Sequence, residues 1–215
     1  VLEESGIKRI NISLDTLNPL KFKQIARGGD LETVLAGIAK MQALGIKIKI
    51  NMVPMRNQNL SDILRLLDFS LERDIELRFI ELMRMGHLLH DSSYQQEFLS
   101  MQEILDEIAT VYSFQRADAP FDSTAVRFHI PDKGYSGIIA NESEPFCTAC
   151  TRLRISSDGY LYGCLSSSRR QSLAELLELP SHLVLPRLQR LLVSALGDKQ
   201  LSFQGETTVM KFIGG

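Results

Sequence analysis

The sequence predicts an α/β protein, with a partial (βα) barrel of parallel strands followed by a smaller α+β domain. Strand and helix patterns alternate over roughly the first 85 residues, and this alternation favours parallel strands joined by right-handed crossovers. From Val126 onward the hydrophobic period changes to two, which is typical of strands in hairpins.

Three strands are expected in the first part of the chain, at Lys8–Leu14, Ile46–Val53 and Ile75–Leu82. Strands buried on both faces should be nearly continuous in apolar residues. Here polar residues alternate with apolar ones, and one face of the first two strands carries Asn11, Ser13, Lys47, Lys49 and Asn51. We therefore expect this face to line the lumen of an open barrel, where ligands gather at the carboxyl ends of the strands. An edge strand with one solvated face is the alternative interpretation.

The helices between these strands have clear start and stop signals. Asn18 is an N-cap followed by Pro19 at the first helical position. Asp30 caps a second helix, which Gly45 ends. A third amphipathic helix is expected over Ser61–Arg73.

In the second part of the chain, capping boxes predict two more helices. Ser100 and Glu103 form the first box, and Ser172 and Glu175 form the second. Each predicts a helix that begins just after its serine.

Two hairpins are expected between these helices. The first pairs Val126–Ile130 with Gly137–Asn141. The second pairs Arg152–Ser156 with Tyr160–Cys164 through Asp158-Gly159, a strong two-residue turn signal.

Composition excludes several classes of protein. Of 215 residues, 44% are hydrophobic and 23% are charged, and 24 basic and 26 acidic residues give a formal charge of −2. These values are ordinary for a globular protein and argue against a nucleic-acid surface. No apolar run reaches the ~18 residues that would span a membrane.

The chain begins at Val1 without a methionine and looks like a protein that has lost its beginning. A targeting segment could have preceded Val1. The cysteine pattern favours a reducing compartment, so a cytoplasmic location is expected.

Cys147 and Cys150 form a C-x2-C pair, and Cys164 follows thirteen residues later at the far end of the second hairpin. A hairpin brings its ends together, so the three sulfurs can converge, and clustered thiolates suit zinc or an iron–sulfur cluster. Three buried structural thiols are the alternative. Zinc usually takes four protein ligands, and His129 or His182 would have to supply the fourth. A four-iron cluster needs no fourth ligand, because one iron can stay open for a small molecule.

Two arginines follow the cysteine pair. Arg152 and Arg154 are two residues apart on a predicted strand and so face the same side. Two guanidinium groups beside a metal form a place for phosphates, which arginine binds bidentately. Solvated strand arginines are the alternative.

The segments RINISLDTL, KIKINMVPMR, IELRFIELM and FCTACTRLRISSDGYLYGCL, with the terminal Gly214-Gly215, resemble one family. It is that of the GTP 3′,8-cyclases of molybdenum cofactor biosynthesis, which are radical S-adenosylmethionine enzymes. The resemblance implies an incomplete α/β barrel and two 4Fe-4S clusters. One cluster cleaves S-adenosylmethionine to a radical, and the other binds GTP, the substrate, through its open iron.

The resemblance also assigns roles to regions of the chain. Residues 1–92 would be the C-terminal half of an incomplete radical S-adenosylmethionine barrel. Residues 93–200 would form the cluster-binding domain, and residues 201–215 an extended tail ending in Gly-Gly.

Individual residues are assigned in the same way. The cluster would be held by Cys147, Cys150 and Cys164. Ser13 and Met83 would contact S-adenosylmethionine, and GTP would be held by Lys49, Arg152, Leu153 and Arg154. A catalytic role would fall to the two arginines and to Gly214 and Gly215, since the family's tail reaches into the active site. Ser13, Lys49 and Met83 are expected at or near the carboxyl ends of three successive strands.

The chain departs from this family at its beginning. The family carries a C-x3-C-x2-C motif near the N-terminus, and no cysteine precedes Cys147 here. We therefore expect these 215 residues alone to be inactive. A homodimer formed through the first strand, or a missing N-terminal portion, would cover the uncovered sheet edge. The alternative function is a zinc-stabilised, non-catalytic binding module derived from the same family.

Overall fold

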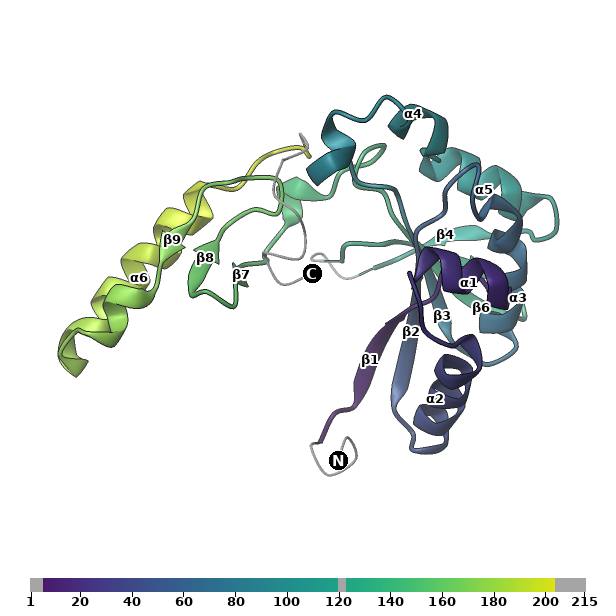
Figure 1. Ribbon diagram of the computed structural model, residues 1–215, viewed down its shortest axis with the longest axis horizontal. Coiled ribbons are helices and arrows are strands. Elements are labelled where there is room, and N and C mark those ends of the chain that lie inside the picture. The colour runs from purple at the N-terminus through teal and green to yellow at the C-terminus, as the bar shows by residue number, and fades with distance from the viewer. Residues whose placement is uncertain (1–5, 120–122, 204–215) are drawn as a thin grey trace. The chain divides into compact units, whose positions relative to one another are not determined.

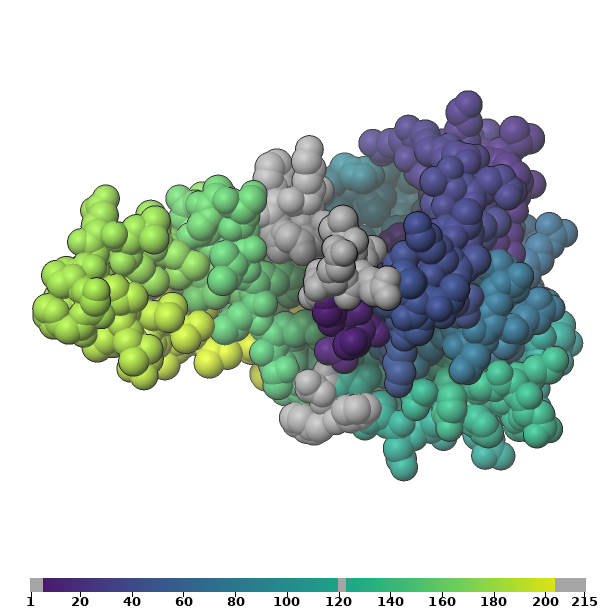
Figure 2. Space-filling model, turned by 90° about the horizontal axis from the view of Figure 1, so that it is seen from below, coloured from purple at the N-terminus to yellow at the C-terminus, as the bar shows by residue number. Residues whose placement is uncertain are grey.

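The computed structural model describes residues 6–119 and 123–203. Within them, one compact unit comprises residues 6–82 and 96–144, and the other comprises residues 83–95 and 145–203. In Figures 1 and 2 the first unit runs from purple to teal, and most of the second is green to yellow. A compact unit is not the same as a domain that folds alone, so the boundaries expected at residues 92 and 200 stay a prediction.

The first unit is built on a six-stranded sheet in the order β1-β2-β3-β6-β5-β4. The first four strands in this order are parallel to one another, and β5 and β4 add antiparallel pairs. The sheet is open within the described residues, with β1 and β4 at its edges, so a barrel stays a proposal. The strands are β1 Arg9–Ser13, β2 Lys47–Met52, β3 Glu76–Ile80, β4 Gln115–Ala117, β5 Val126–Ile130 and β6 Gly134–Ile139.

Helices lie on one face of this sheet, as Figure 1 shows. They are α1 Pro19–Ile25, α2 Leu31–Ala43, α3 Ile63–Leu71 and α5 Met101–Ala109. Three predicted N-terminal signals are confirmed, since the side chains of Asn18, Asp30 and Ser100 accept backbone hydrogen bonds at the helix starts. The third predicted helix differs slightly, because it begins as a 3-10 turn at Leu60–Asp62.

The core lies between these helices and the apolar face of the sheet. Ile50, Leu77 and Phe79 of the central strands are 0% exposed, as are Leu66 and Leu67 of α3. Burial of each such side chain contributes about 1.5–3 kcal/mol. Because alternate residues of a strand face opposite sides, the same packing turns the polar residues of β1, β2 and β3 to the other face.

A buried carboxylate fixes the loops that follow the central strands. Glu81, directly after β3, is 0% exposed. It accepts hydrogen bonds from the backbone N–H groups of Met101 (2.7 Å), Glu142 (2.8 Å) and Ser143 (3.0 Å). The charge is therefore satisfied, and it links the start of α5 to the segment after β6.

The second unit contains a three-stranded antiparallel sheet, of β7 Arg154–Ile155, β8 Tyr160–Tyr162 and β9 Gln171–Ser172. The long helix α6, Ser181–Gly197, packs on it through a small core of Leu161, Leu191 and Ala195. Short helical turns lie at Gly86–Leu89, Cys147–Ala149 and Ala174–Leu177, and α4, Tyr94–Glu97, spans the sequence boundary between the units. No helix among the described residues is long and apolar enough to cross a membrane.

Three further elements differ from the sequence-based expectations. The second predicted hairpin is shorter than expected, with strands at Arg154–Ile155 and Tyr160–Tyr162. The first predicted hairpin exists, but β6 begins earlier, at Gly134, and pairs in parallel with β3, so it extends the sheet of the first unit. The prediction of a capped helix beginning after Ser172 is wrong. Ser172 is the last residue of β9, and the 3-10 turn that follows Leu173 has no side-chain cap. Pairing of Ser172 with Tyr160 decides the local structure, and the next long helix begins only at Ser181.

Candidate functional site

The polar face of the sheet in the first unit carries its side chains in register. One row runs across five strands, through Ser13, Asn51, Arg78, Gly137 and Arg127. The next row toward the amino ends contains Asn11, Lys49 and Glu76. The polar alternation predicted for β1 and β2 is therefore confirmed, and it extends to β3.

Glu76 lies at the centre of the charges on this face. Its carboxylate oxygen Oε1 is 2.8 Å from Lys49 Nζ and 3.0 Å from Arg78 Nε, and Oε2 is 3.5 Å from an Arg127 guanidinium nitrogen. Burial acts to raise the pKa of Glu76, but the hydrogen bonds from Lys49 and Arg78 outweigh it, and the pKa lies below its ordinary value. One carboxylate thus faces three cations, which leaves an excess of positive charge.

Gly137 lies between Arg78 and Arg127 in the first of these rows. Because it has no side chain, it leaves room for both arginine side chains. A Cβ at Gly137 would lie 3.2 Å from the Ala125 side chain and 3.6 Å from Arg78 Cγ. Arg127 also stacks on Tyr135, 3.7 Å from the ring centroid. Two buried polar atoms on this face have no hydrogen-bond partner within the described residues: Asn51 Oδ1 and Arg127 Nε.

A pocket of about 570 Å³ opens at the row of Asn11, Lys49 and Glu76 and extends toward the amino ends of the strands. Lys49 lines it, three residues before the end of β2 rather than at the carboxyl end where it was expected. Asp74 and Glu76 are the acidic residues of its lining, and the basic ones are Arg9, Lys47, Lys49, Arg73, Arg127 and Lys133. Such a lining suits a polyanion.

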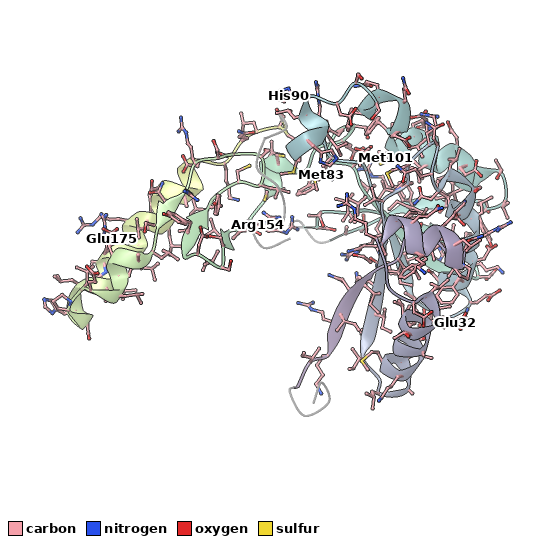
Figure 3. The ribbon with its side chains drawn as sticks, viewed as in Figure 1. Glu32, Met83, His90, Met101, Arg154 and Glu175 are labelled. Carbon is pink, nitrogen blue, oxygen red and sulfur yellow. The ribbon has the colours of Figure 1, made fainter. Side chains whose placement is uncertain are left out.

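Ser13 and Met83, the expected contacts of S-adenosylmethionine, belong to different units. Ser13 is the last residue of β1 and is exposed. Nearby, Asp15 accepts a hydrogen bond from Val53 N–H at 2.7 Å, and burial raises its pKa. Met83 is half-buried, three residues beyond β3, and belongs to the second unit (Figure 3).

The three cysteines lie in the second unit. Cys147 begins a 3-10 turn, and the backbone N–H of Cys150 donates to the carbonyl of Cys147 at 3.2 Å. Cys164 follows β8 after one residue. All three are free thiols of intermediate exposure. Among the described residues, no group of three His, Cys, Asp or Glu side chains has the geometry to hold a single metal ion.

The thiols nevertheless influence one another. Burial raises the pKa of Cys147, and the neighbouring Cys164 and Cys150 raise it further. For Cys164, burial acts in the same direction but is outweighed by hydrogen bonds with the Ser166 hydroxyl and the Gln200 backbone N–H, so the pKa lies below that of an ordinary thiol. The three cysteines are therefore close enough for their charges to affect one another. That their sulfurs converge on one metal centre stays a prediction.

Arg152 and Arg154 lie beside these thiols. Burial, followed by the charge of Arg152, lowers the pKa of Arg154, while Cys150 and Cys164 act to raise it. Arg152 lies over the Phe146 ring, 5.4 Å from its centroid, and Arg154 begins β7 (Figure 3). Between them, Leu153 packs against the small core of the second unit. Only Arg154 lies on a strand, because β7 begins there, so strand alternation does not relate the two side chains. Their joint role in binding phosphate stays a prediction.

Within the described residues, neither histidine suggested as a fourth zinc ligand belongs to a group of three His, Cys, Asp or Glu side chains that could hold a metal ion. His129 lies on β5, where the centroid of its ring is 4.9 Å from that of the Tyr135 ring. His182 is in the first turn of α6, about 22 Å along the helix from its last residue, Gly197, at 1.5 Å per residue. Gly214 and Gly215 lie outside the described residues.

Three site residues were missed from the sequence: Glu76, Arg78 and Lys199. Glu76 and Arg78 alternate with buried Leu77 and Phe79 on β3, so the alternation used for the first two strands could have found them. Lys199 lies in a short segment after α6, with its Nζ 3.6 Å from Cys150 Sγ, and no sequence pattern relates it to the cysteines.

Comparison with known proteins gives two family matches. A model described as Molybdenum Cofactor Synthesis C matches residues 75–204, and one described as the Radical SAM superfamily matches residues 1–70.

A GTP 3′,8-cyclase of Synechocystis sp. is 37% identical over 164 residues, covering 76% of this chain and 50% of that protein. One of Listeria monocytogenes is 38% identical over 168 residues, with the same coverage. One of Saccharophagus degradans is 32% identical over 218 residues, covering 99% of this chain and 65% of that protein. The chain spans about half the length of the first two relatives.

Proposed function

Because the chain belongs to the Molybdenum Cofactor Synthesis C family, we propose that it carries the C-terminal part of a GTP 3′,8-cyclase. This radical S-adenosylmethionine enzyme performs the first step of molybdenum cofactor biosynthesis. The observation that carries the proposal is the arrangement of Cys147, Cys150 and Cys164, three free and partly buried thiols in one electrostatic environment, with Arg154 beside them.

These residues suit a three-cysteine 4Fe-4S cluster better than structural zinc. Structural zinc is held by four ligands at about 2.0–2.3 Å, and the described residues contain no such group. A four-iron cluster is larger than one ion, so its cysteines need not be so close together. When bound, it would supply an open iron that takes a ligand atom of GTP.

The chain's own residues then bind and orient the nucleotide. Arg152 and Arg154 hold phosphate oxygens through their paired guanidinium groups. Since the Leu153 side chain packs in the core, Leu153 contacts GTP through its backbone. Lys49, on the polar sheet face, provides a further positive charge for the triphosphate.

Ser13 and Met83 are proposed to contact S-adenosylmethionine, and Gly214 and Gly215 to enter the active site. The 215 residues contain no cysteine before Cys147, so this polypeptide alone is expected to form no 5′-deoxyadenosine and no cyclised GTP. Detection of 5′-deoxyadenosine above a protein-free control, with reductant present, would contradict this. Free thiols favour a reducing compartment, and we place the protein in the cytoplasm.

Anaerobic reconstitution tests the metal centre. We expect about four iron and four sulfide per chain, as one 4Fe-4S cluster requires. A variant with all three cysteines changed to serine should bind none. Stoichiometric zinc without iron, from a reconstitution that offers both metals, would instead favour the zinc-stabilised binding module.

A further inference from the structure

The segment directly after α6 lies against both cysteine-bearing segments. Lys199 Nζ is 2.6 Å from the carbonyl oxygen of Arg152, 3.0 Å from that of Gly163, and 3.6 Å from Cys150 Sγ. An ammonium group has three N–H donors and no acceptor. Its three donors therefore face three acceptors, drawn from the two segments that carry Cys150 and Cys164.

Helix α6 can reach this position because residue 163 is a glycine. A Cβ on Gly163 would lie 1.6 Å from the carbonyl oxygen of Ala195 and 2.6 Å from its carbonyl carbon. The backbone of α6 thus packs directly on the residue that precedes Cys164. Lys199 follows Ala195 by four residues, so the close approach of Ala195 to Gly163 determines where the backbone of Lys199 lies.

The neighbours of Lys199 in the sequence, Asp198 and Gln200, also make side-chain hydrogen bonds. Asp198 Oδ2 accepts a hydrogen bond from Gln171 at 3.5 Å, and its Oδ1 is 3.4 Å from Arg169. The Gln200 side-chain carbonyl accepts from the Ser166 hydroxyl at 3.0 Å, and that hydroxyl is 3.4 Å from Cys164 Sγ. The backbone around Lys199 is therefore fixed from both sides.

We propose that Lys199 is a positioning residue of the metal centre. It links the segment of Cys150 to the segment of Cys164, and it places a fixed positive charge beside the Cys150 sulfur. The identity of the bound group rests on the proposed function, but the link belongs to the chain itself and exists without metal.

The two parts of this role have different measurable consequences. The link lowers the freedom of two segments that must hold one cluster, so it slows cluster loss. The charge stabilises the reduced, more negative form of a cluster, so it raises the reduction potential. Hydrogen bonds and charges next to ligating sulfurs are known determinants of both properties.

The test compares Lys199→Met, which keeps the aliphatic chain but removes charge and donors, with Lys199→Arg, which keeps the charge. Arg187→Met is the matched control, because Arg187 lies on α6, the helix that precedes Lys199, and pairs with exposed Glu175. In the metal-free chain, we expect amide hydrogen exchange at residues 150–153 and 162–165 to be about tenfold faster in Lys199→Met. A change of this size corresponds to the loss of about one hydrogen bond to a charged group. Exchange in Arg187→Met should match the unmodified chain there.

In the reconstituted chain, Lys199→Met should lose iron to a chelator several times faster and show a more negative potential. Lys199→Arg should keep a potential close to that of the unmodified chain. Unchanged hydrogen exchange in Lys199→Met would overturn the link, and an unchanged potential would overturn the role of the charge. If the unmodified chain takes up no iron, the proposed metal centre fails, while the exchange comparison still decides the link.

Discussion

Lys49 and Glu76 face each other on neighbouring parallel strands, with Nζ and Oε1 2.8 Å apart. The lysine expected to bind GTP is therefore held by a carboxylate, which also contacts Arg78 and Arg127. Such a carboxylate orients several cations before any anion binds. The pocket beside them carries an excess of positive charge that a polyphosphate can use.

The first prediction concerns Glu76 and pH. Its pKa in the folded chain lies below the ordinary value, so ionised Glu76 contributes stability above pH ~4.3, and this contribution is lost as the pH falls through the folded-state pKa. Glu76→Gln should lower the free energy of unfolding at pH 7 by about 1–3 kcal/mol. It should also flatten the acid limb of the stability curve.

Urea unfolding between pH 3 and pH 7 measures both effects. Glu32→Gln is the control, because Glu32 is exposed in the first turn of α2 (Figure 3). If the curves of stability against pH are parallel for the unmodified chain and Glu76→Gln, the ion pairs of Glu76 with the three cations do not contribute to stability, and the prediction is wrong.

The second prediction concerns phosphate binding in the second unit. Arg152→Ala or Arg154→Ala should weaken GTP binding to the reconstituted chain by roughly 1.5–3 kcal/mol, the usual value of a hydrogen bond to a charged group. Both variants should retain their iron. Arg170→Ala is the control, since Arg170 stacks on Tyr160, 3.9 Å from its ring centroid, and is exposed. If calorimetry gives the unmodified chain and all three variants equal affinities for GTP, the two arginines take no part in binding the nucleotide.

The third prediction concerns the packing of α6 on β8. Gly163→Ala should destabilise the second unit by about 3 kcal/mol, since the new Cβ cannot occupy the position of the Ala195 carbonyl. Gly197→Ala is the matched control: nothing lies within 4 Å of its added Cβ, and alanine in the last turn of a helix should be neutral or stabilising by up to ~1 kcal/mol. Thermal unfolding of both variants measures the difference, and similar midpoints would contradict the close approach.

The fourth prediction concerns the edge strand β1. Within the described sheet, β1 pairs only with β2, and an exposed edge offers backbone groups for pairing with a second copy. We expect concentration-dependent dimers in sedimentation at ~100 μM, the range in which uncovered strand edges associate. Asn11→Lys, at an exposed position of β1, should weaken this association several-fold because like charges would meet across the edge. A clean monomer of the unmodified chain at that concentration would refute the prediction.

Local signals in the sequence predicted much of the first unit. Asn18 and Asp30 cap the helices where they were expected, because a cap is formed by residues two or three positions apart. The strand alternation likewise placed Asn11, Lys49 and Asn51 on one face, since the side-chain period of a strand is fixed by its backbone. The same reasoning failed at Ser172, where pairing with Tyr160 outweighed a local capping signal.

By itself, the sequence determined which residues could form a metal centre: the spacing of Cys147, Cys150 and Cys164 and the Asp158-Gly159 turn are local features. Only the tertiary structure decided what surrounds it. That β6 joins β3 in parallel, that Glu76 collects three cations, and that Lys199 reaches Cys150 across 49 residues all depend on pairing between distant segments. Such pairing follows from the packing of whole elements, as in the approach of Ala195 to Gly163, and a local sequence pattern does not show which distant segments will meet.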